Sequence, residues 1–264
     1  GSLIPAQQLP RTYLPLWFAV TLPETYLLAL GCALVLLLRT RRKPWLGRRQ
    51  LGGALVAASA FGPLMAAVLL RPTVYDAQRH FLFIVPPLAA LAGVSLTRFL
   101  RERTLSPGLR SVTCGALLGL GGMIAVDSVR LHPYEYVYFN RLIGGLPGAQ
   151  ARFETEYWGA SYTEGLRWLA GQLQNRDLSV RVATCNHDQA VVEFLREHPE
   201  LAQRVKLEQN ADAADIFLAT TRFGCPKTQG QVLHVVERMG VPFLYVVQRR
   251  ALTSKGVLIA NRWL

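Results

Sequence analysis

The segment LGGALVAASAFGPLMAAVLL, residues 51–70, decides the fold of this chain, because it contains no charged side chain. At about 1.5 Å per residue, a helix of this length spans about 30 Å, the thickness of the membrane's hydrocarbon core. Apolar segments of similar length lie at 22–38, 81–97 and 111–131. Helices buried in a large soluble protein are the alternative, but the number of segments favours about four transmembrane helices. Residues 9–17 are apolar but contain two prolines, so we expect a surface-lying or re-entrant stretch there rather than a straight helix.

The loops between these segments differ in charge, and the difference predicts an orientation. Residues 39–50 carry six Lys/Arg and no acid, and residues 98–110 carry four Arg and one acid. Residues 71–80 carry two Arg and one Asp. Since cytoplasmic loops of membrane proteins are enriched in Lys and Arg, the first two loops are expected in the cytoplasm. The loop at 71–80, the N-terminal residues and everything after Leu131 are then extracytoplasmic.

The net charge of +12 does not indicate a nucleic-acid-binding protein. Residues 1–131 hold 14 Lys/Arg and 4 Asp/Glu, whereas residues 132–264 hold 15 and 13. The excess therefore lies in short loops among apolar segments and not on one folded basic face. Charged residues make up only 17% of the chain, below the roughly 25% of soluble domains. We expect membrane lipid, and no nucleic acid, as a partner.

Residues 132–264 have a different pattern, in which short strand-like and helix-like segments alternate. Strands are predicted at 178–185, 204–207, 214–220, 242–248 and 257–260, and helices at 163–173, 188–198 and 232–239. No glycine-rich phosphate loop follows any of these strands, so no nucleotide site is indicated. The predicted architecture is a membrane all-α bundle over 1–131 followed by a small extracytoplasmic α/β domain over 132–264.

The four cysteines divide between the two regions. Cys32 and Cys114 lie in predicted spans, where they are packing residues. Cys185 and Cys225 lie in the second region, where an oxidising compartment permits a disulfide. The spacing alone does not show that these two residues are close, so both the bonded and the free state stay open. The sequence has no CxxC or His/Cys cluster, and we expect neither a metal site nor a cofactor.

Three stretches are similar to one known family. They are LPRTYLPLW with TLPE (9–17 and 21–24), VYDAQRHFLFIVPPLAALAG (74–93), and HPYEYVYFNRLIGGLPGA followed by FETEYWGASYTEGLRWL (132–149 and 153–169). Together they resemble the C-terminal part of bacterial integral-membrane glycosyltransferases of the GT-C superfamily. The closest group is the protein-mannosyltransferase-like, aminoarabinose-transferase-like family. The resemblance covers about residues 1–170, and the third stretch is its most specific part.

The resemblance implies a multi-pass protein of the inner (plasma) membrane. Such enzymes transfer a sugar from a polyprenyl-phosphate donor to an acceptor at the outer membrane face, and they have roughly a dozen spans. Their catalytic carboxylates lie in a first outer loop that has no counterpart here. The chain is therefore expected to be a C-terminal portion without catalytic residues, inactive alone, with sugar and acceptor undetermined. A non-enzymatic, membrane-anchored extracytoplasmic binding module is the alternative, since it needs only the topology.

The loop at 71–80 provides the candidate residues for the donor phosphate. Arg79 and His80 come first, with Arg71 and Tyr75 beside them, because a guanidinium at the membrane surface donates paired hydrogen bonds to phosphate. Two simpler interpretations remain open. Arg79 extends to lipid headgroups as an anchor, or it pairs with Asp76.

Other candidates lie near the predicted ends of the spans. Tyr13 and Trp17 are expected to line a lipid or acceptor groove, with an interfacial aromatic belt as the alternative. The acids Glu24 and Asp127 are either functional or simply solvated at the interface. A structural role is favoured for four residues that follow the last span, which are Glu154, Glu156, Tyr157 and Trp158.

Overall fold

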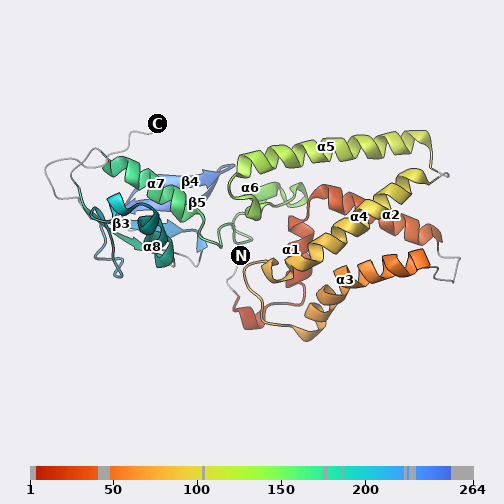
Figure 1. Ribbon diagram of the computed structural model, residues 1–264, viewed down its shortest axis with the longest axis horizontal. Helices are drawn as coiled ribbons and strands as arrows, with labels where there is room; N and C mark the ends of the chain where they lie inside the picture. The colour runs from red at the N-terminus through yellow and green to blue at the C-terminus, as the bar shows by residue number, and fades with distance from the viewer. Residues whose placement is uncertain are drawn as a thin grey trace. The chain divides into compact units, whose positions relative to one another are not determined.

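The computed structural model describes residues 4–40, 48–102, 105–174, 178–185, 187–222, 225 and 230–250. The chain divides into two compact units, Ser2–Gly145 and Leu146–Leu264. The first unit is helical and the second combines helices with a sheet (Figure 1). Residues 132–145, which the sequence groups with the second domain, pack within the helical unit. The expected helical region followed by a mixed region is thus present.

Three helical segments of the described residues are long and apolar enough to cross a membrane. They are Leu51–Leu70 in α3 (Arg48–Leu70), the segment formed by η2 (Arg79–Ile84) and α4 (Val85–Arg101), and α5 (Pro107–Leu131). Many of their apolar side chains are exposed, with Leu70 at 80% and Leu118 at 79%. Exposed apolar surface of this extent requires an environment other than water. These helices indicate a membrane protein, as the sequence predicts.

The first predicted span differs from a single helix over 22–38. Helix α1 (Tyr13–Thr21) and helix α2 (Glu24–Thr40) meet at an angle of 109°. They supply a fourth span only if the bent pair counts as one. The expectation for residues 9–17, a surface-lying or re-entrant stretch rather than a straight helix, agrees with this bend, although a short helix does begin at Tyr13. Pro15 lies in the first turn of α1, where a missing N–H breaks no helical hydrogen bond, and the break comes later, at Pro23.

Proline also sets the start of α4. The expected span 81–97 contains Pro86 and Pro87 well inside the apolar run, yet both lie in the first turn of α4. The preceding turn, η2, is a 3-10 helix with non-helical dihedrals at Phe81. Helix α4 packs against both α2 and α3, and a buried cluster joins these elements to α1: Phe18, Leu22, Ala60, Ile84 and Leu88.

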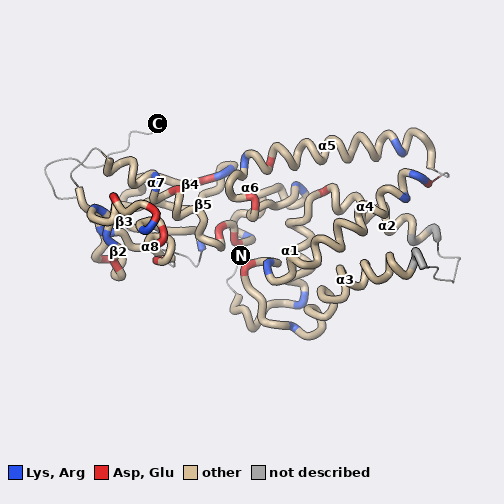
Figure 2. The backbone as a smooth tube through the Cα atoms, in the orientation of Figure 1, with Lys and Arg blue, Asp and Glu red and all other residues tan. Residues whose placement is uncertain are grey.

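The two ends of the helical unit differ in charge. Antiparallel connections place the end of α2, the start of α3, the end of α4 and the start of α5 at one end, where Arg98, Arg101 and Arg110 lie (Figure 2). The opposite end holds the loop at 71–80 and residues 132–145, which include η3 (Glu135–Val137) and η4 (Arg141–Ile143). The helix ends that flank the two loops predicted on one side of the membrane therefore do share one end of the unit.

The second unit is built on a five-stranded sheet with the order β2-β1-β3-β5-β4. Strand β1 runs parallel to β2 and β3, and β5 runs antiparallel to β3 and β4. The strands are β1 (Val180–Thr184), β2 (Val205–Leu207), β3 (Ile216–Thr220), β4 (Gln231–Arg238) and β5 (Val241–Gln248). The helices are α6 (Gly145–Ala149), α7 (Ser161–Leu173), α8 (Asp188–Glu197) and η5 (Pro199–Leu201).

Both faces of this sheet are covered. Helix α7 packs on the face that presents Leu244 and Val246, and it also contacts α8. Alternation along the strands turns Phe217 and Val247 to the other face, where they form a buried cluster with Cys225. The predicted strands at 178–185, 204–207, 214–220 and 242–248 and the helices at 163–173 and 188–198 are confirmed within a few residues.

The predicted helix at 232–239 is wrong, because this segment forms strand β4. Met239 and Gly240 both have positive φ, 53° and 76°, and form a two-residue turn that returns the chain into β5. Turns with positive φ at both central residues match the twist of a hairpin. Pairing with β5 thus outweighs the helical spacing of Val232, Val235 and Val236. The predicted strand at 257–260 lies outside the described residues.

An ion pair at the start of β1 makes the stability of this unit depend on acid pH. Arg181 donates to both carboxylate oxygens of Asp215, with the closest contact at 2.9 Å. Burial alone would raise the pKa of Asp215, but the hydrogen bonds and charge of Arg181 outweigh it and lower that pKa below its ordinary value. The stabilisation is therefore complete above the unfolded pKa of about 4 and is lost as pH falls through the lower folded value.

We expect Asp215→Asn to reduce the acid sensitivity of the α/β unit. Its thermal midpoint should fall by a few degrees less than that of the wild type between pH 5 and pH 3, because the variant has no carboxylate to protonate at this position. The measurement is thermal unfolding in detergent across this pH range. Glu197→Gln is the matched control, since it removes an exposed carboxylate of α8 and should leave the pH profile unchanged. Equal profiles for the wild type and Asp215→Asn would contradict the assignment.

Candidate functional site

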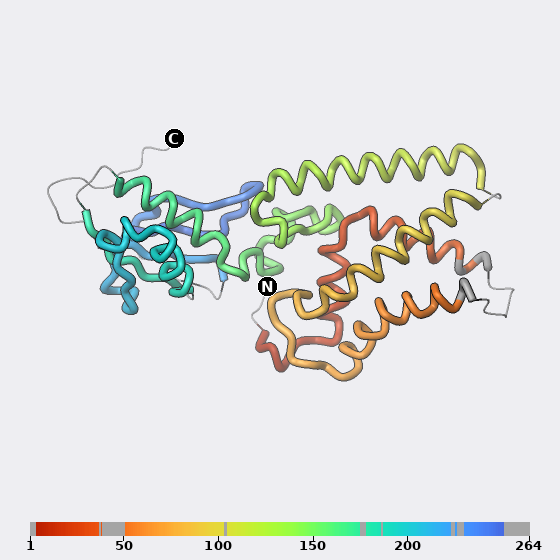
Figure 3. Tube along the Cα trace, viewed as in Figure 1, coloured from red at the N-terminus to blue at the C-terminus, as the bar shows by residue number. Residues whose placement is uncertain are grey.

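A cleft opens at the end of the helical unit that holds the loop at 71–80. It encloses about 380 Å³, including space open to solvent. Its lining residues come from the N-terminal segment that precedes α1 and from the end of α3 with the following loop. The backbone of these two segments is traced in Figure 3. Arg11, Tyr13 and Arg71 supply its polar groups. The remaining lining is mostly apolar: Ala6, Gln7, Leu9, Pro10, Leu14, Ala67, Val68, Pro72 and Val74.

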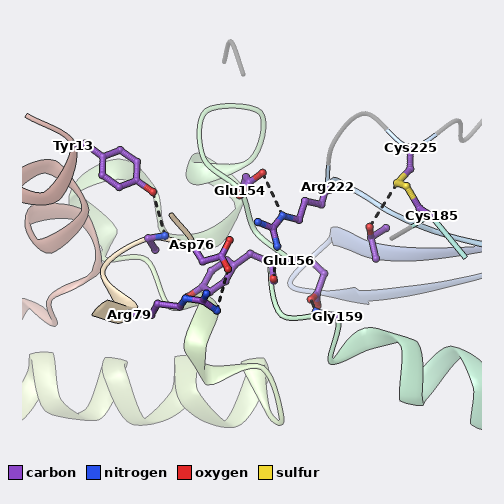
Figure 4. Close-up of polar contacts among 12 residues, drawn as sticks. Tyr13, Asp76, Arg79, Glu154, Glu156, Gly159, Cys185, Arg222 and Cys225 are labelled. Atoms are coloured by element: carbon purple, nitrogen blue, oxygen red, sulfur yellow. Dashed lines mark hydrogen bonds and ion pairs between the residues drawn. A yellow bond between two sulfur atoms is a disulfide. The ribbon is translucent and has the colours of Figure 1, made fainter. Parts of the chain in front are cut away.

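The backbone of the neighbouring loop adopts an unusual conformation. Arg71, Asp76 and Ala77 have φ values of 53°, 54° and 60°. Residues with a Cβ rarely take up this left-handed conformation, and they keep it only where the surrounding contacts impose it. Here the Tyr13 hydroxyl accepts a 3.2 Å hydrogen bond from the Ala77 N–H (Figure 4). The Gln78 side chain also donates to Thr21 of α1. Contacts with α1 thus hold the loop in place.

The four predicted phosphate-binding residues have different environments. Arg79 lies 3.1 Å from the buried carboxylate of Asp76 (Figure 4). Its guanidinium lies over the Tyr75 ring, 4.5 Å from the ring centroid. The exposed His80 ring contacts the same Tyr75 edge-on at 4.7 Å. These three predicted residues therefore form one cluster with Asp76, while Arg71 lines the cleft. The pairing of Arg79 with Asp76 matches one of the simpler interpretations of the sequence.

The two predicted groove residues also differ. Tyr13 lines the cleft, as the groove prediction requires. Trp17 is buried, with 6% of its surface exposed, and its ring packs against Phe139 at 5.6 Å and Tyr13 at 6.2 Å. Trp17 therefore does not line the cleft but packs against Tyr13, which does. A lipid or acceptor that entered the cleft would reach Tyr13 first.

The acids near the ends of the spans are held by the segment that follows α5. Glu24 accepts hydrogen bonds from the Tyr138 hydroxyl at 2.7 Å and the Arg141 N–H at 2.6 Å. The Arg141 guanidinium donates to both oxygens of Asp127 at 2.9 Å. Burial first, and then the carboxylate of Glu24, raise the pKa of Tyr138, so its hydroxyl remains a donor. Both acids thus have defined partners, and solvation by water is not their main stabilisation.

Asn140 joins the same segment to the break between α1 and α2. Its amide group donates to the carbonyls of Ala19 at 2.7 Å and Leu22 at 3.1 Å, and its backbone N–H donates to Val20 at 2.8 Å. The last carbonyls of a helix have no partner within the helix. The fully buried Asn140 therefore satisfies the carbonyls that the 109° bend leaves without partners.

The polar residues of the stretch at 153–169 pack within the α/β unit. Glu154 lies 3.7 Å from Arg222, which also donates to the Tyr157 carbonyl at 2.6 Å. The buried carboxylate of Glu156 accepts a hydrogen bond from the Gly159 N–H (Figure 4). Trp158 is 46% exposed. The contacts of the two glutamates agree with the structural role that the sequence favours for them.

A disulfide joins Cys185, which follows β1, to Cys225, which follows β3 (Figure 4). The sequence left this pair undecided, because only the parallel pairing of β1 and β3 brings the two residues together. Among the described residues, no group of three His, Cys, Asp or Glu side chains is arranged to hold a metal ion.

Sequence reasoning missed the roles of Arg11 and Asn140. Arg11 lies between the two prolines of the apolar stretch at 9–17, and an isolated basic residue in such a stretch is a signal for a headgroup contact. Asn140 follows Tyr134, Tyr136, Tyr138 and Phe139, and no local pattern there signals a contact with helix carbonyls. Comparisons with protein-family models, curated proteins and solved structures found no match to this chain.

Proposed function

We propose that this chain is the C-terminal part of a membrane glycosyltransferase that takes its sugar from a polyprenyl-phosphate donor at the outer membrane face. The proposal rests on the resemblance of three stretches to GT-C enzymes and on the apolar helices that indicate a membrane protein. It places the end of the helical unit with the cleft at the outer surface, in accord with the lower positive charge of the loop at 71–80.

One observation carries the proposal most directly: the first two family-like stretches and residues 132–145 of the third lie together at one end of the helical unit. Tyr13 of the first stretch contacts Ala77 of the second. Glu24, which ends the first stretch, binds Tyr138 and Arg141 of the third. Segments separated by more than 100 residues are thus joined by hydrogen bonds beside the apolar helices. Contacts between all three stretches support a common role in binding a lipid-linked substrate.

In the proposed enzyme, the Arg79 cluster contacts the donor. Asp76 and Tyr75 fix the Arg79 guanidinium. The Arg79 side chain is 32% exposed, and its guanidinium has further hydrogen-bond donors for a phosphate oxygen. His80 lies on the same Tyr75 ring and supplies a further donor. The resemblance implies that the carboxylates of the chemical step lie in a first outer loop without a counterpart here, so we propose that this chain contributes binding and orientation.

The test is binding of a short-chain polyprenyl-phosphate sugar to the purified protein in detergent. We expect Arg79→Ala to lose more than about tenfold in affinity, because one charge-assisted contact to phosphate contributes about 1.5–3 kcal/mol. Arg101→Ala is the matched control, since it removes the same charge at the opposite end of the helices.

Two outcomes count against the proposal. Equal binding by the wild type and Arg79→Ala removes Arg79 from the donor site. Absence of donor binding by the wild type favours the alternative, a membrane-anchored module that acts through its α/β unit without sugar transfer. Circular dichroism of each variant confirms that the helices are intact.

A further inference from the structure

The cleft combines two cations with no anion to neutralise them. Arg11 and Arg71 line it from opposite sides, one from the N-terminal segment and one from the end of α3. Within the part of the chain that the structure describes, neither guanidinium forms an ion pair. Arg79 differs, because Asp76 compensates its charge. Two uncompensated guanidinium groups beside one cavity attract a ligand with negative charge.

The rest of the cleft is suited to hydrocarbon. Leu9 and Leu14 line one side, and Ala67, Val68 and Val74 line the other. Ala67 and Val68 belong to the last turn of the apolar segment Leu51–Leu70, so the cleft lies at the end of a candidate membrane span. A small soluble anion would leave this apolar lining in water, whereas a chain attached to the anion would cover it.

We infer that the cleft binds the phosphate headgroup of a membrane lipid. Arg11 and Arg71 donate hydrogen bonds to the phosphate oxygens, and the apolar lining contacts the first part of the attached chain. Tyr13, whose ring also lines the cleft, connects an occupied cleft to the loop, because its hydroxyl holds the Ala77 N–H. The phosphate belongs either to a polyprenyl phosphate or to a phospholipid of the bilayer. Only the first assignment rests on the proposed function.

The arginines at this end of the helical unit then have different roles. Arg11 and Arg71 bind the lipid anion directly. Arg79 contacts the sugar-bearing donor in the proposed enzyme and, through Asp76, stabilises the loop. Removal of the two cleft arginines should therefore weaken binding of any lipid whose phosphate gives it a net negative charge, with or without a sugar.

The experiment measures binding to the purified protein in a neutral detergent. The probes are a short-chain polyprenyl phosphate, the matching polyprenol, dioleoylphosphatidylglycerol, dioleoylphosphatidylcholine and inorganic phosphate. The variants are Arg11→Ala/Arg71→Ala, the charge-retaining Arg11→Lys/Arg71→Lys, and the control Arg98→Ala/Arg101→Ala. The control removes two exposed arginines from the opposite end of the helices. Arg11 and Arg71 are themselves exposed, so their replacement should leave the fold intact.

We expect the alanine pair to lose at least about tenfold in affinity for a phosphorylated lipid, the lysine pair to lose less, and the control to bind as the wild type does. Polyprenol should bind at least about tenfold more weakly than its phosphate. Unchanged binding by the alanine pair, or equal binding of polyprenol and its phosphate, overturns the inference. Inorganic phosphate that binds as tightly as the lipids also overturns it.

The source of the phosphate is decided by comparison of the two anionic lipids. Tight binding of phosphatidylglycerol over phosphatidylcholine, lost in the alanine pair, supports the cleft as a phospholipid site even if the donor does not bind. Preference for polyprenyl phosphate supports the cleft and the proposed function together. If Arg11→Ala/Arg71→Ala loses affinity for the donor and Arg79→Ala does not, only the role assigned to Arg79 is contradicted.

Discussion

Removal of the disulfide between Cys185 and Cys225 is expected to lower the free energy of unfolding of the α/β unit by about 4 kcal/mol. The bond closes a loop with a sequence separation of 40, and the chain-entropy relation gives this magnitude for a loop of that length. The loop includes α8, β2 and β3, so the disulfide restrains the segments that form these elements when the chain is unfolded. A change of this size corresponds to roughly a thousandfold larger population of the opened state.

Hydrogen exchange measured by mass spectrometry on the detergent-solubilised protein tests this expectation locally. Peptides from β1 and β3 should lose protection in Cys185→Ala/Cys225→Ala, and peptides from α5 should not change. Cys114→Ala is the control, because it removes an exposed thiol from α5 and breaks no bond. Unchanged protection of β1 and β3 in the double variant would show that the native packing, and not loop closure, limits opening of the sheet.

Replacement of Asn140 by alanine is expected to destabilise the helical unit by about 2–4 kcal/mol. The variant leaves the carbonyls of Ala19 and Leu22 without their side-chain donors at a fully buried position. A buried polar group that loses its partner costs about 1–3 kcal/mol. The α1–α2 junction should loosen as a result, and the thermal midpoint should fall by roughly 5–10 °C.

A thiol-reactive dye provides a measurement confined to the helical unit. In a Cys114→Ala background, the buried Cys32 is the free thiol of the described residues and reacts only when the helices open. Leu142→Ala is the control from the same segment, since this side chain is 75% exposed and its loss should change stability by no more than about 0.5 kcal/mol. An unchanged midpoint in Asn140→Ala would mean that water replaces the amide at the bend.

Regular elements with strong local patterns were predictable from the sequence. The charge-free run at 51–70 and the apolar run that ends at Leu131 are helices in the structure, because a long apolar segment in a membrane satisfies its backbone only within itself. The strands at 180–184 and 241–248 follow from their β-branched and aromatic residues. The segment at 232–239 was not predictable, since its valines fit either period and pairing with β5 decided the outcome.

The candidate site shows the same division. Arg71, Tyr75, Arg79, His80 and Tyr13 could be selected from their positions near predicted membrane boundaries. The sequence could not show that these residues lie together. The ion pair of Arg79 with Asp76 and the contact of Tyr13 with Ala77 depend on how separate helices pack. The role of Asn140 also needs the 109° bend, which no local pattern specifies.

The sequence by itself indicated a membrane protein and selected the residues near the ends of its apolar segments, since hydrophobic length and charge act locally along the chain. The tertiary structure alone decided which polar groups became partners. It paired Arg79 with Asp76, brought Arg11 to Arg71 across one cleft, and joined Cys185 to Cys225. The physical reason is that hydrogen bonds, ion pairs and disulfides form over a few ångströms in space, at sequence separations that no periodicity encodes.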